Sequence, residues 1–189
     1  MPSIAHSFGL FCDTAMIGVI TYGIPANNNL NTIAGVPGLE LNRLCVQEYA
    51  PKNSASILVG RSLQKIPAPC CVISYADCGQ GHIGYIYQAT NFVYTGKGSG
   101  DVEFLKDGKK HHRKALFNIY GTGSRDVLTE HGYEAVKVEA KHRYCFFCGD
   151  RRQKKQMLAE LAWPILPYPK GETKRYDSGK NVPSQRILF

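Results

Sequence analysis

The sequence predicts an α/β fold with a mixed central sheet and flanking helices, built around a βαβ core. Residues 7–23 hold two apolar runs on either side of Asp13 and Thr14, which is the pattern of an antiparallel hairpin. Residues 39–46 and 70–76 are apolar enough for buried strands, and the segment between them has helical periodicity. A strand–helix–strand unit joins parallel strands by a right-handed crossover. The hairpin and this unit together give a sheet that contains both strand directions.

The helix of the βαβ unit has a defined start and end. Asn53 and Ser54 are both good N-cap residues, and Pro67 stops the helix. The apolar positions that recur at helical spacing are Ala55, Leu58, Val59, Leu63 and Ile66. A second helix is expected over residues 81–90, followed directly by the strand NFVYTG.

The C-terminal half adds a strand and a basic helix. Residues 134–148 are expected to be extended and end in the apolar run YCFFC. In the helical stretch RRQKKQMLAELA, we expect Met157, Leu158 and Leu161 to face inward and the basic residues to face outward.

Length and composition favour one globular domain. The chain has 189 residues, of which 43% are hydrophobic and 20% charged, so a single domain over residues 1–170 is expected. Residues 96–114 are polar and rich in Gly, Lys and His, which indicates a mobile insertion within that domain. Residues 171–189 are expected to form a polar C-terminal tail.

The charge of the chain points to a polyanionic partner. The net charge is +8 at pH 7, which favours nucleic acid, although a basic protein without such a partner has the same composition. The start of the chain lacks the pattern of a signal peptide, and no apolar run has the roughly 20 residues that span a bilayer. We therefore expect no membrane partner and a cytoplasmic location. A monomer and a homodimer both remain open.

The cysteines predict free thiols and no metal site. Their number is seven and their spacing shows no disulfide framework, as in a protein of a reducing compartment. Cys145 and Cys148 have the spacing of half a zinc site, but a second cysteine pair is missing from the sequence. The adjacent His111 and His112 are expected to lie in a solvated loop.

Several motifs resemble a known family. They are LELNRL, NSASILVGRSL, SYAD-x-x-QGH-x-GYIYQATNF, KHRY and ILPYPKG, and they extend over residues 7–171. Together they resemble the Mom family of phage adenine-modifying proteins. LELNRLCVQEYAPKNSASILVGRSL and CCVISYADCGQGHIGYIYQATNFVYTG also resemble, in the same order, the two halves of the GCN5-related N-acyltransferase core.

The resemblance to that core implies a particular arrangement of the two parallel strands. The first strand leads to a helix N-terminus that holds the acyl donor, and the second strand is splayed from the first. Two departures stand out. The core usually opens with a strand and two helices before the hairpin, so this opening is expected to be shortened here. The usual donor loop is rich in glycine, whereas APKNSAS has none.

The product that the resemblance implies is adenine, in double-stranded DNA, with a methylcarbamoyl group on its exocyclic nitrogen. This modification protects phage DNA from host restriction, and it implies a phage-encoded protein acting in the bacterial cytoplasm. Because the added atoms are those of a glycyl unit, the favoured donor is an activated glycine such as glycyl-tRNA, with tRNA as carrier. Acetyl-CoA or another acyl-CoA is the alternative donor. A base inside a duplex has to flip before its amine can react.

The candidate catalytic residues are Tyr87, Asp77, Ser54, Arg43 and His82. Tyr87 falls where the acyltransferase core carries a general-acid tyrosine, although a core tyrosine would give the same pattern. Asp77 follows the second parallel strand, where open α/β sheets bind ligands; it is a candidate base for the adenine amine or a cap for the next loop. Arg43 lies in a strand that should be buried, where polar side chains need partners. His82 begins the second helix, either in the site or at the surface.

The candidate binding residues fall into three groups. The donor is expected to meet backbone amides and hydroxyls at the first helix N-terminus, through Asn53, Ser54, Ala55, Ser56 and Val46. The flipped adenine is expected to lie near Asn42 and to stack on Tyr75, Tyr85 or Tyr94. The candidate phosphate contacts are Lys109, Lys110, Arg113, Lys114, Lys141, Arg143, Arg151, Arg152, Lys154 and Lys155. A solvated helix face is the other interpretation of residues 151–155.

Two other classes of protein remain open. One is an acyl-CoA-dependent N-acyltransferase that acts on a small amine or a protein, which glycines in the donor loop would favour. The other is a non-catalytic DNA-binding relative that keeps the basic residues but has a filled cleft.

Overall fold

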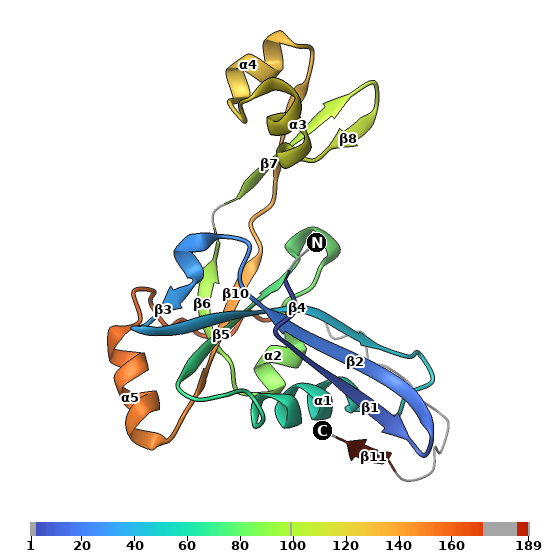
Figure 1. Cartoon of the computed structure of the whole chain (residues 1–189), viewed down its shortest axis with the longest axis vertical. Helices are drawn as coiled ribbons and strands as arrows, with labels where there is room; N and C mark the ends of the chain where they lie inside the picture. The colour runs from blue at the N-terminus through green and yellow to red at the C-terminus, as the bar shows by residue number, and fades with distance from the viewer. Residues whose placement is uncertain (1–2, 99, 172–184, 189) are drawn as a thin grey trace. The chain divides into compact units, whose positions relative to one another are not determined.

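The computed structural model describes residues 3–98, 100–171 and 185–188 (Figure 1). The chain divides into two compact units. The first unit comprises Met1–Ala76, Ile83–Gly96 and His142–Phe189, and the second comprises Asp77–His82 and Lys97–Lys141. The second unit is therefore inserted into the chain of the first. Its longer segment begins near the start of the polar insertion that the sequence places at residues 96–114, but this segment runs on to Lys141.

The first unit is a mixed α/β structure with a mainly antiparallel sheet of eight strands and flanking helices. Seven strands follow the order β11-β1-β2-β4-β5-β10-β6, and β3 pairs with β4. Their bounds are β1 His6–Cys12, β2 Ala15–Gly23, β3 Thr32–Ile33, β4 Val36–Val46, β5 Cys70–Ala76, β6 Val93–Lys97, β10 His142–Cys148 and β11 Gln185–Leu188.

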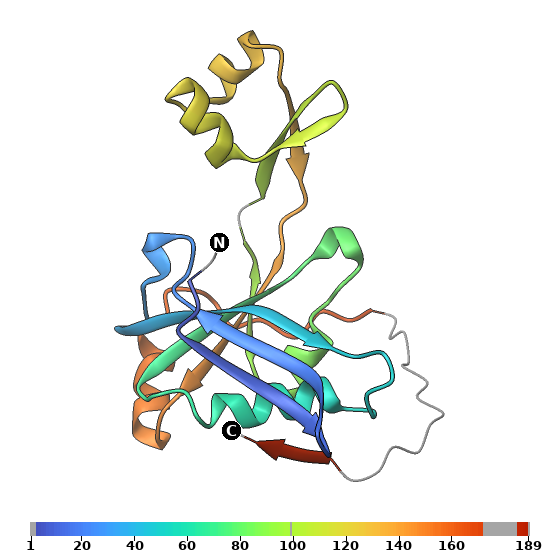
Figure 2. The same cartoon turned by 45° about the vertical axis from the view of Figure 1, so that its right-hand side comes forward.

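The N-terminal hairpin forms as predicted. β1 and β2 pair antiparallel from His6↔Tyr22 to Cys12↔Ala15, so the turn lies at Asp13. Asp13 has a φ of 53°, a left-handed conformation that a short polar side chain tolerates. At the other edge of β1, β11 pairs antiparallel (Figure 2), so this part of the expected polar tail is a strand. Residues 172–184 and 189 of that tail lie outside the described residues.

The βαβ unit is confirmed. β4 and β5 run parallel, and α1 (Ser54–Leu63) connects them, ending three residues before the predicted Ile66. Leu58, Val59 and Leu63 of α1 are at most 4% exposed and belong to the main core cluster.

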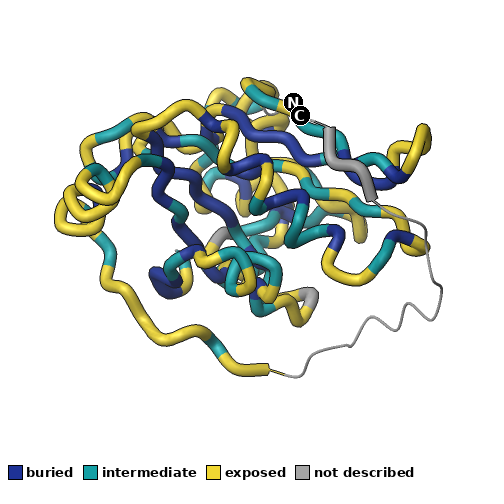
Figure 3. Tube along the Cα trace, turned by 90° about the horizontal axis from the view of Figure 1, so that it is seen from below, coloured by how far each residue is buried: buried dark blue, intermediate teal, exposed yellow. Residues whose placement is uncertain are grey.

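The two faces of the sheet bury different clusters. Figure 3 marks the buried stretches of the chain in dark blue. Val72 of β5 packs in the cluster that contains α1 and α2 (Tyr85–Ala89), whereas its neighbour Ile73 packs in the cluster of α5 (Arg151–Glu160). Successive strand residues point to opposite faces, so α1 and α2 cover one face and α5 covers the other. Met157 is buried against its face as predicted. Leu158 is 41% exposed, so its predicted inward position is wrong.

Two other expectations about secondary structure were wrong. The helix expected over residues 81–90 is shorter, because Gly81 and Gly84 have left-handed φ angles of 68° and 77° and α2 begins after Gly84. The strand expected over residues 134–148 is divided into β9 (Glu134–Val138) and β10, which belong to different sheets.

The second unit is a three-stranded antiparallel sheet with two helices. The sheet order is β8-β7-β9, with β7 at Asp101–Lys106 and β8 at Lys109–His111. The helices are α3 (Arg113–Tyr120) and α4 (Arg125–Glu130), and a short 3-10 helix, η2, covers Cys78–Gln80. The core of this unit consists of Phe104, Leu116, Leu128 and Tyr133. The β7–β8 hairpin lies within residues 96–114, for which the sequence predicted a polar excursion.

Candidate active site

The parallel strands β4 and β5 stop pairing part-way along their length. Their register runs Gly38↔Cys71, Leu39↔Val72 and Glu40↔Ile73. Both strands continue beyond these pairs, β4 to Val46 and β5 to Ala76. Ser74 is therefore the first residue of β5 beyond its pairing with β4.

Tyr87 of α2 lies beside Ser74. Burial raises the pKa of Tyr87, and the nearby Ser74 hydroxyl lowers it by a smaller amount. Ser74 is 0% exposed, and its Oγ has no well-formed hydrogen bond within the described part of the chain. A buried hydroxyl without a partner is unfavourable, so this pair of hydroxyls has unused capacity to bind a polar group.

Tyr144 of β10 fixes the start of α2. Its hydroxyl donates to the Ile83 carbonyl and accepts from Gln88 Nε2 at 3.2 Å. Its ring packs against Tyr87 with 5.4 Å between centroids. A Cβ on Gly84 would come within 2.5 Å of the Tyr144 ring, so a glycine is required at the helix start both by this approach and by its φ of 77°. These contacts fix the position of Tyr87. They also agree with the alternative interpretation, in which Tyr87 is a tyrosine that packs in the core.

The N-terminus of α1 has no side-chain cap. Asn53 is the N-cap residue but has a φ of 68° and makes no capping hydrogen bond, so the predicted capping is wrong. Ser54 Oγ donates to the Pro51 carbonyl at 2.6 Å, and Ser56 Oγ donates to the Asn53 carbonyl at 2.9 Å. The N–H of Ser54, the first residue of the helix, donates to the Pro51 carbonyl at 3.1 Å, so an anion at this end would meet the N–H groups that follow it. Ala55 is the second residue of this turn.

A cavity of about 640 Å³ lies beside α1 in the first unit. Its lining residues come from α1 and the segment after it, the end of α2, and the β10–α5 connection: Ser56, Ile57, Gly60, Leu63, Gln64, Ile66, Ala68, Ala89, Thr90, Asn91, Phe146, Cys148, Gly149 and Lys154. Of the predicted donor contacts, Ser56 lines this cavity, whereas Val46, the last residue of β4, packs against the main core. The volume is in the range that small ligands and cofactors occupy.

The polar residues of β4 have different surroundings. Asn42 is half-buried and satisfied, because its Oδ1 accepts from Thr21 Oγ1 at 2.8 Å and its Nδ2 donates to the Ser3 carbonyl at 3.0 Å. Arg43 is exposed, so the expectation that it is buried in the sheet was wrong; its guanidinium donates to the Asn42 carbonyl at 2.8 Å.

Asp77 and His82 belong to the second unit. Asp77 follows the last residue of β5, and its Oδ1 accepts from the Gly79 backbone N–H at 2.9 Å. The capping role that we gave as the alternative for Asp77 is therefore present. Its other oxygen lies 3.9 Å from Lys141 Nζ, a distance at which exposed ion pairs contribute little. His82 is exposed and precedes α2 by two residues, so the prediction that it begins this helix is wrong.

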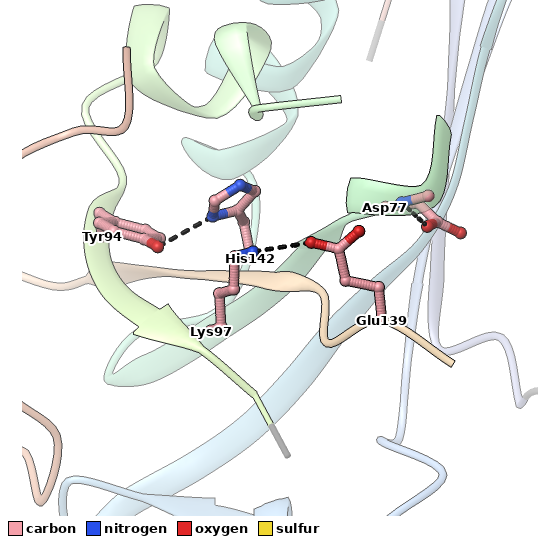
Figure 4. A network of polar contacts seen from close by, with 6 residues as sticks. Asp77, Tyr94, Lys97, Glu139 and His142 are labelled. Carbon is pink, nitrogen blue, oxygen red and sulfur yellow. Dashed lines mark hydrogen bonds and ion pairs between the residues drawn. The ribbon is translucent and has the colours of Figure 1, made fainter. Parts of the chain in front are cut away.

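The three candidate stacking tyrosines are not equivalent. Tyr94 is 8% exposed, with its hydroxyl 2.8 Å from His142 Nδ1 (Figure 4) and its ring packed against His142 and Tyr144. Tyr85 is 40% exposed and donates to the Gly171 carbonyl at 2.8 Å. Tyr75 is half-buried, and burial raises its pKa. Tyr85 and Tyr75 therefore offer more accessible ring surface than Tyr94.

The candidate phosphate contacts differ in how exposed they are and in the contacts that they already make. Arg143 is half-buried, with its guanidinium 3.8 Å from the Trp163 ring centroid and hydrogen-bonded to Thr95 Oγ1 at 2.8 Å, so much of it is already engaged. Arg151, Arg152, Lys154 and Lys155 are exposed on α5. Lys154 Nζ lies 5.6 Å from the centre of the Phe146 ring, at the wall of the cavity.

Sequence reasoning missed Ser74, Tyr144 and His142. A polar residue in the middle of the apolar run CCVISYA was a usable signal for Ser74. His142 and Tyr144 lie in the KHRY motif, but their contacts with Tyr94 and Tyr87 depend on strand pairing that periodicity does not specify. Within the described residues, no group of three or more His, Cys, Asp or Glu side chains is placed to hold a metal ion.

Together the fold and the site define a basic, mixed α/β protein in which the parallel strands separate beside a half-buried tyrosine, with a ligand-sized cavity next to α1. No helix in the described ranges is long and apolar enough to cross a membrane. The profile of the Mom protein family matches residues 1–170, so the chain belongs to this family. It is 29% identical over 173 residues to the methylcarbamoylase Mom of Escherichia phage Mu, a match that covers 86% of this chain and 70% of that protein.

Proposed function

We propose that this protein modifies phage DNA by acyl transfer to adenine and leaves a methylcarbamoyl group on the exocyclic nitrogen. Membership of the Mom family and the name of the phage Mu relative support a role in DNA modification. The observation that carries the chemical proposal is the Tyr87 hydroxyl, held beside the buried Ser74 hydroxyl at the point where β4 and β5 stop pairing.

The fold that we propose is a variant of the GCN5-related N-acyltransferase core. Three features support it: the parallel pair β4–β5 with α1 between its strands, the end of pairing part-way along both strands, and α2 placed after β5. We propose that the acyl group of the donor enters between the separated strands. Ser74 and Tyr87 are the polar groups that would meet it there.

The reaction that we propose is balanced with an activated glycine as the donor. The exocyclic amine of adenine attacks the glycyl carbonyl carbon, a C–N bond forms, and the bond from that carbon to the carrier oxygen breaks. The departing oxygen takes a proton and leaves as a hydroxyl. The free glycyl amine then attacks ring carbon 6, and the original exocyclic nitrogen leaves that carbon and remains as the carboxamide. Adenine thus gains the atoms of one glycyl residue, with no oxidant or reductant.

Tyr87 would supply the proton to the departing oxygen. A general acid has to hold its proton until the bond breaks, and burial, which raises the pKa of Tyr87, keeps the phenol protonated at neutral pH. Tyr144 would hold Tyr87 in place through its ring contact and its hydrogen bond to the start of α2. We predict that Asp77 accepts the proton that the adenine amine loses.

The donor would bind along α1. The Ser54 N–H donates to the Pro51 carbonyl, so the N–H groups of Ala55 and Ser56 are the ones that would meet a phosphate at the N-terminus of this helix. The cavity beside the helix offers room for the part of the donor that does not react. Glycyl-tRNA is the donor that accounts for all atoms of the added group, and tRNA would then be a second nucleic-acid partner. Acyl-CoA remains the competing donor, with an ordinary N-acyltransferase as the competing function.

The substrate would be double-stranded DNA with a flipped adenine, and the modification would protect phage DNA from restriction. The decisive experiment expresses the full chain in a bacterium and analyses the nucleosides of its DNA by mass spectrometry. We expect a deoxyadenosine heavier by one glycyl residue, and isotope-labelled glycine should label it. Tyr87→Phe, produced at the same level, is the matched control and should abolish most of the product. Unmodified adenine in the presence of folded wild-type protein would refute the proposal.

A further inference from the structure

Part of α3 does not pack in the core of the second unit. Leu116 of α3 packs with Phe104, Leu128 and Tyr133, and Tyr120 packs at the edge of this cluster. Phe117, the neighbour of Leu116, is 55% exposed and lies outside the cluster. A single exposed apolar side chain is common on protein surfaces, so any role for Phe117 depends on the residues around it.

Exposed polar residues surround Phe117 on α3. Arg113 and Lys114 precede it by four and three residues, which are the spacings of neighbours on a helix surface. Asn118 lies one turn after Lys114 and is also exposed. The exposed α3 face is defined by these four residues: Arg113, Lys114, Phe117 and Asn118. It combines an aromatic ring, two cations and an amide, and the guanidinium of Arg113 is held by hydrogen bonds to the Gly123 carbonyl at 3.3 and 3.0 Å.

The β7–β8 hairpin of the same unit carries a further exposed cation. Its turn consists of Asp107 and Gly108, whose φ angles of 52° and 71° are those of the tight turns that match strand twist. Lys109 follows directly and is exposed. Lys110, the next residue, pairs with Glu103 at 2.6 Å. By contrast, Lys109 and Lys114 have no ion-pair partner among the described residues, so their charges are available to an external anion.

We propose that the exposed α3 face, together with Lys109, is a docking surface for duplex DNA, with Phe117 as a wedge at a base step. Cations that lack internal partners fit the regularly spaced phosphates of a duplex. DNA-bending proteins insert apolar side chains between base pairs to unstack them, and Phe117 is such a side chain between the cations Arg113 and Lys114. Unstacking suits an enzyme whose target amine is inside the duplex. This inference rests on the proposed function only for the identity of the nucleic acid.

The test uses the full chain and two matched substitutions on α3. Ile119 is 67% exposed and lies on a different side of α3 from Phe117, so Ile119→Ala removes a similar exposed side chain away from the proposed surface. One probe is a DNA duplex that carries 2-aminopurine beside an adenine. The other is a tRNA whose length equals that of one strand of the duplex. We expect Phe117→Ala to weaken duplex binding roughly tenfold, the usual scale for a lost base contact, and to remove the rise in 2-aminopurine fluorescence. Ile119→Ala should change neither.

The cations are tested separately. Lys109→Glu with Lys114→Glu should weaken duplex binding at low salt, and the slope of log affinity against log salt should fall by about two. Equal effects of Phe117→Ala and Ile119→Ala, or an unchanged salt slope, would overturn the inference. Loss of tRNA binding with intact duplex binding would also overturn it and assign the surface to RNA.

The proposed function is judged by a different measurement. If wild-type protein produces methylcarbamoyl adenine while all variants bind duplex DNA normally, the docking surface is wrong and the function stands. If wild-type protein produces no modified adenine but the binding pattern is as expected, the function is wrong and the docking surface stands.

Discussion

The Ser74 hydroxyl lowers the pKa of Tyr87, while burial of the same phenol raises that pKa by more. The two side chains come from different elements, β5 and α2, and each is held by packing in the core of the first unit. Ser74 Oγ is fully buried but lacks a well-formed hydrogen bond in the described part of the chain. A protonated phenol beside an unsatisfied hydroxyl is an arrangement that a polar ligand would complete.

Tyr87→Phe should lower the rate of adenine modification about 100-fold, because general acids contribute on this scale. The ring contacts with Tyr144 and Phe92 survive this change, so the thermal midpoint should shift little. Tyr168→Phe is the control, since it removes a hydroxyl that donates to the Phe92 carbonyl at 2.7 Å outside the proposed chemistry. Nucleoside mass spectrometry and thermal denaturation give the two readouts. Full modification with a lowered midpoint would make Tyr87 a core residue only.

The substitution Asp77→Asn distinguishes a capping role of Asp77 at η2 from a role as proton acceptor in the reaction. An amide oxygen can still accept from the Gly79 N–H, so the turn at η2 should remain, whereas the negative charge is lost. If Asp77 accepts a proton, Asp77→Asn should lose about 100-fold in rate while Asp77→Ala loses both rate and stability. If Asp77 is only a cap, Asp77→Asn should modify adenine like the wild type and Asp77→Ala should be less stable. Single-turnover rates and thermal midpoints distinguish these results.

Two parts of the first unit could be predicted because their signals are local. The hairpin at Asp13 and the βαβ unit through α1 both follow from apolar periodicity within a short window of sequence. Tyr87 could be proposed from its place in a motif, but the Ser74 and Tyr144 contacts could not. Those contacts depend on the register between strands far apart in the chain, such as Tyr144↔Ser74 in β10 and β5.

The second unit was missed for a physical reason. Its core uses Phe104, Leu116, Leu128 and Tyr133, which are too widely spaced to give a periodic pattern in any window. Its strands are short and carry many charges, so the segment resembles a polar loop. The exposed Arg43 was misjudged because a β4 position was assumed to be buried on both faces, whereas β4 parts from β5 before it reaches Arg43.

Charge reversal on α5 tests whether this helix contacts DNA. Arg151, Arg152 and Lys155 are exposed and do not line the cavity, unlike Lys154, so the triple change to Glu leaves the cavity intact. Two of these positions lie at the helix N-terminus, where Glu is favourable, so the helix should persist. If α5 contacts phosphates, duplex affinity should fall for all sequences and the salt slope should decrease by up to about three. Gln153→Ala, which breaks the capping box with Asp150 but keeps the charges, is the control for helix damage.

High pH should unfold the protein through its buried thiols. Burial raises the pKa of Cys70 to about 11, and burial together with Cys70 raises the pKa of Cys148 to about 12. Below about pH 8.5, both thiols are protonated in the folded and unfolded states, so they add no pH dependence. Above that pH, only the unfolded state ionises, and each thiol lowers the free energy of unfolding by about 1.4 kcal/mol per pH unit up to its folded pKa.

The measurement is the free energy of unfolding in urea at pH 7 and pH 10. Cys70→Ala should be less stable than the wild type at pH 7, because it shortens a side chain that is 3% exposed. It should nevertheless lose less stability between the two pH values. An equal loss in the variant and the wild type would show that other groups control alkaline unfolding.

Substitution of Gly60 tests whether the cavity beside α1 holds the donor. Gly60 lines the cavity, and a Cβ built on it meets nothing within 4 Å, so side chains at this position project into open space. Because a glycine inside a helix is destabilising, Gly60→Ala should raise the free energy of unfolding by about 0.5–1 kcal/mol and leave room for a ligand. Gly60→Leu and Gly60→Phe should be folded at least as well but fill progressively more of the cavity. If the donor binds there, the KM for the donor should rise in the order Ala, Leu, Phe, while duplex binding stays unchanged. A Gly60→Phe variant with wild-type KM would place the donor elsewhere, since a filled cavity and normal donor binding are incompatible.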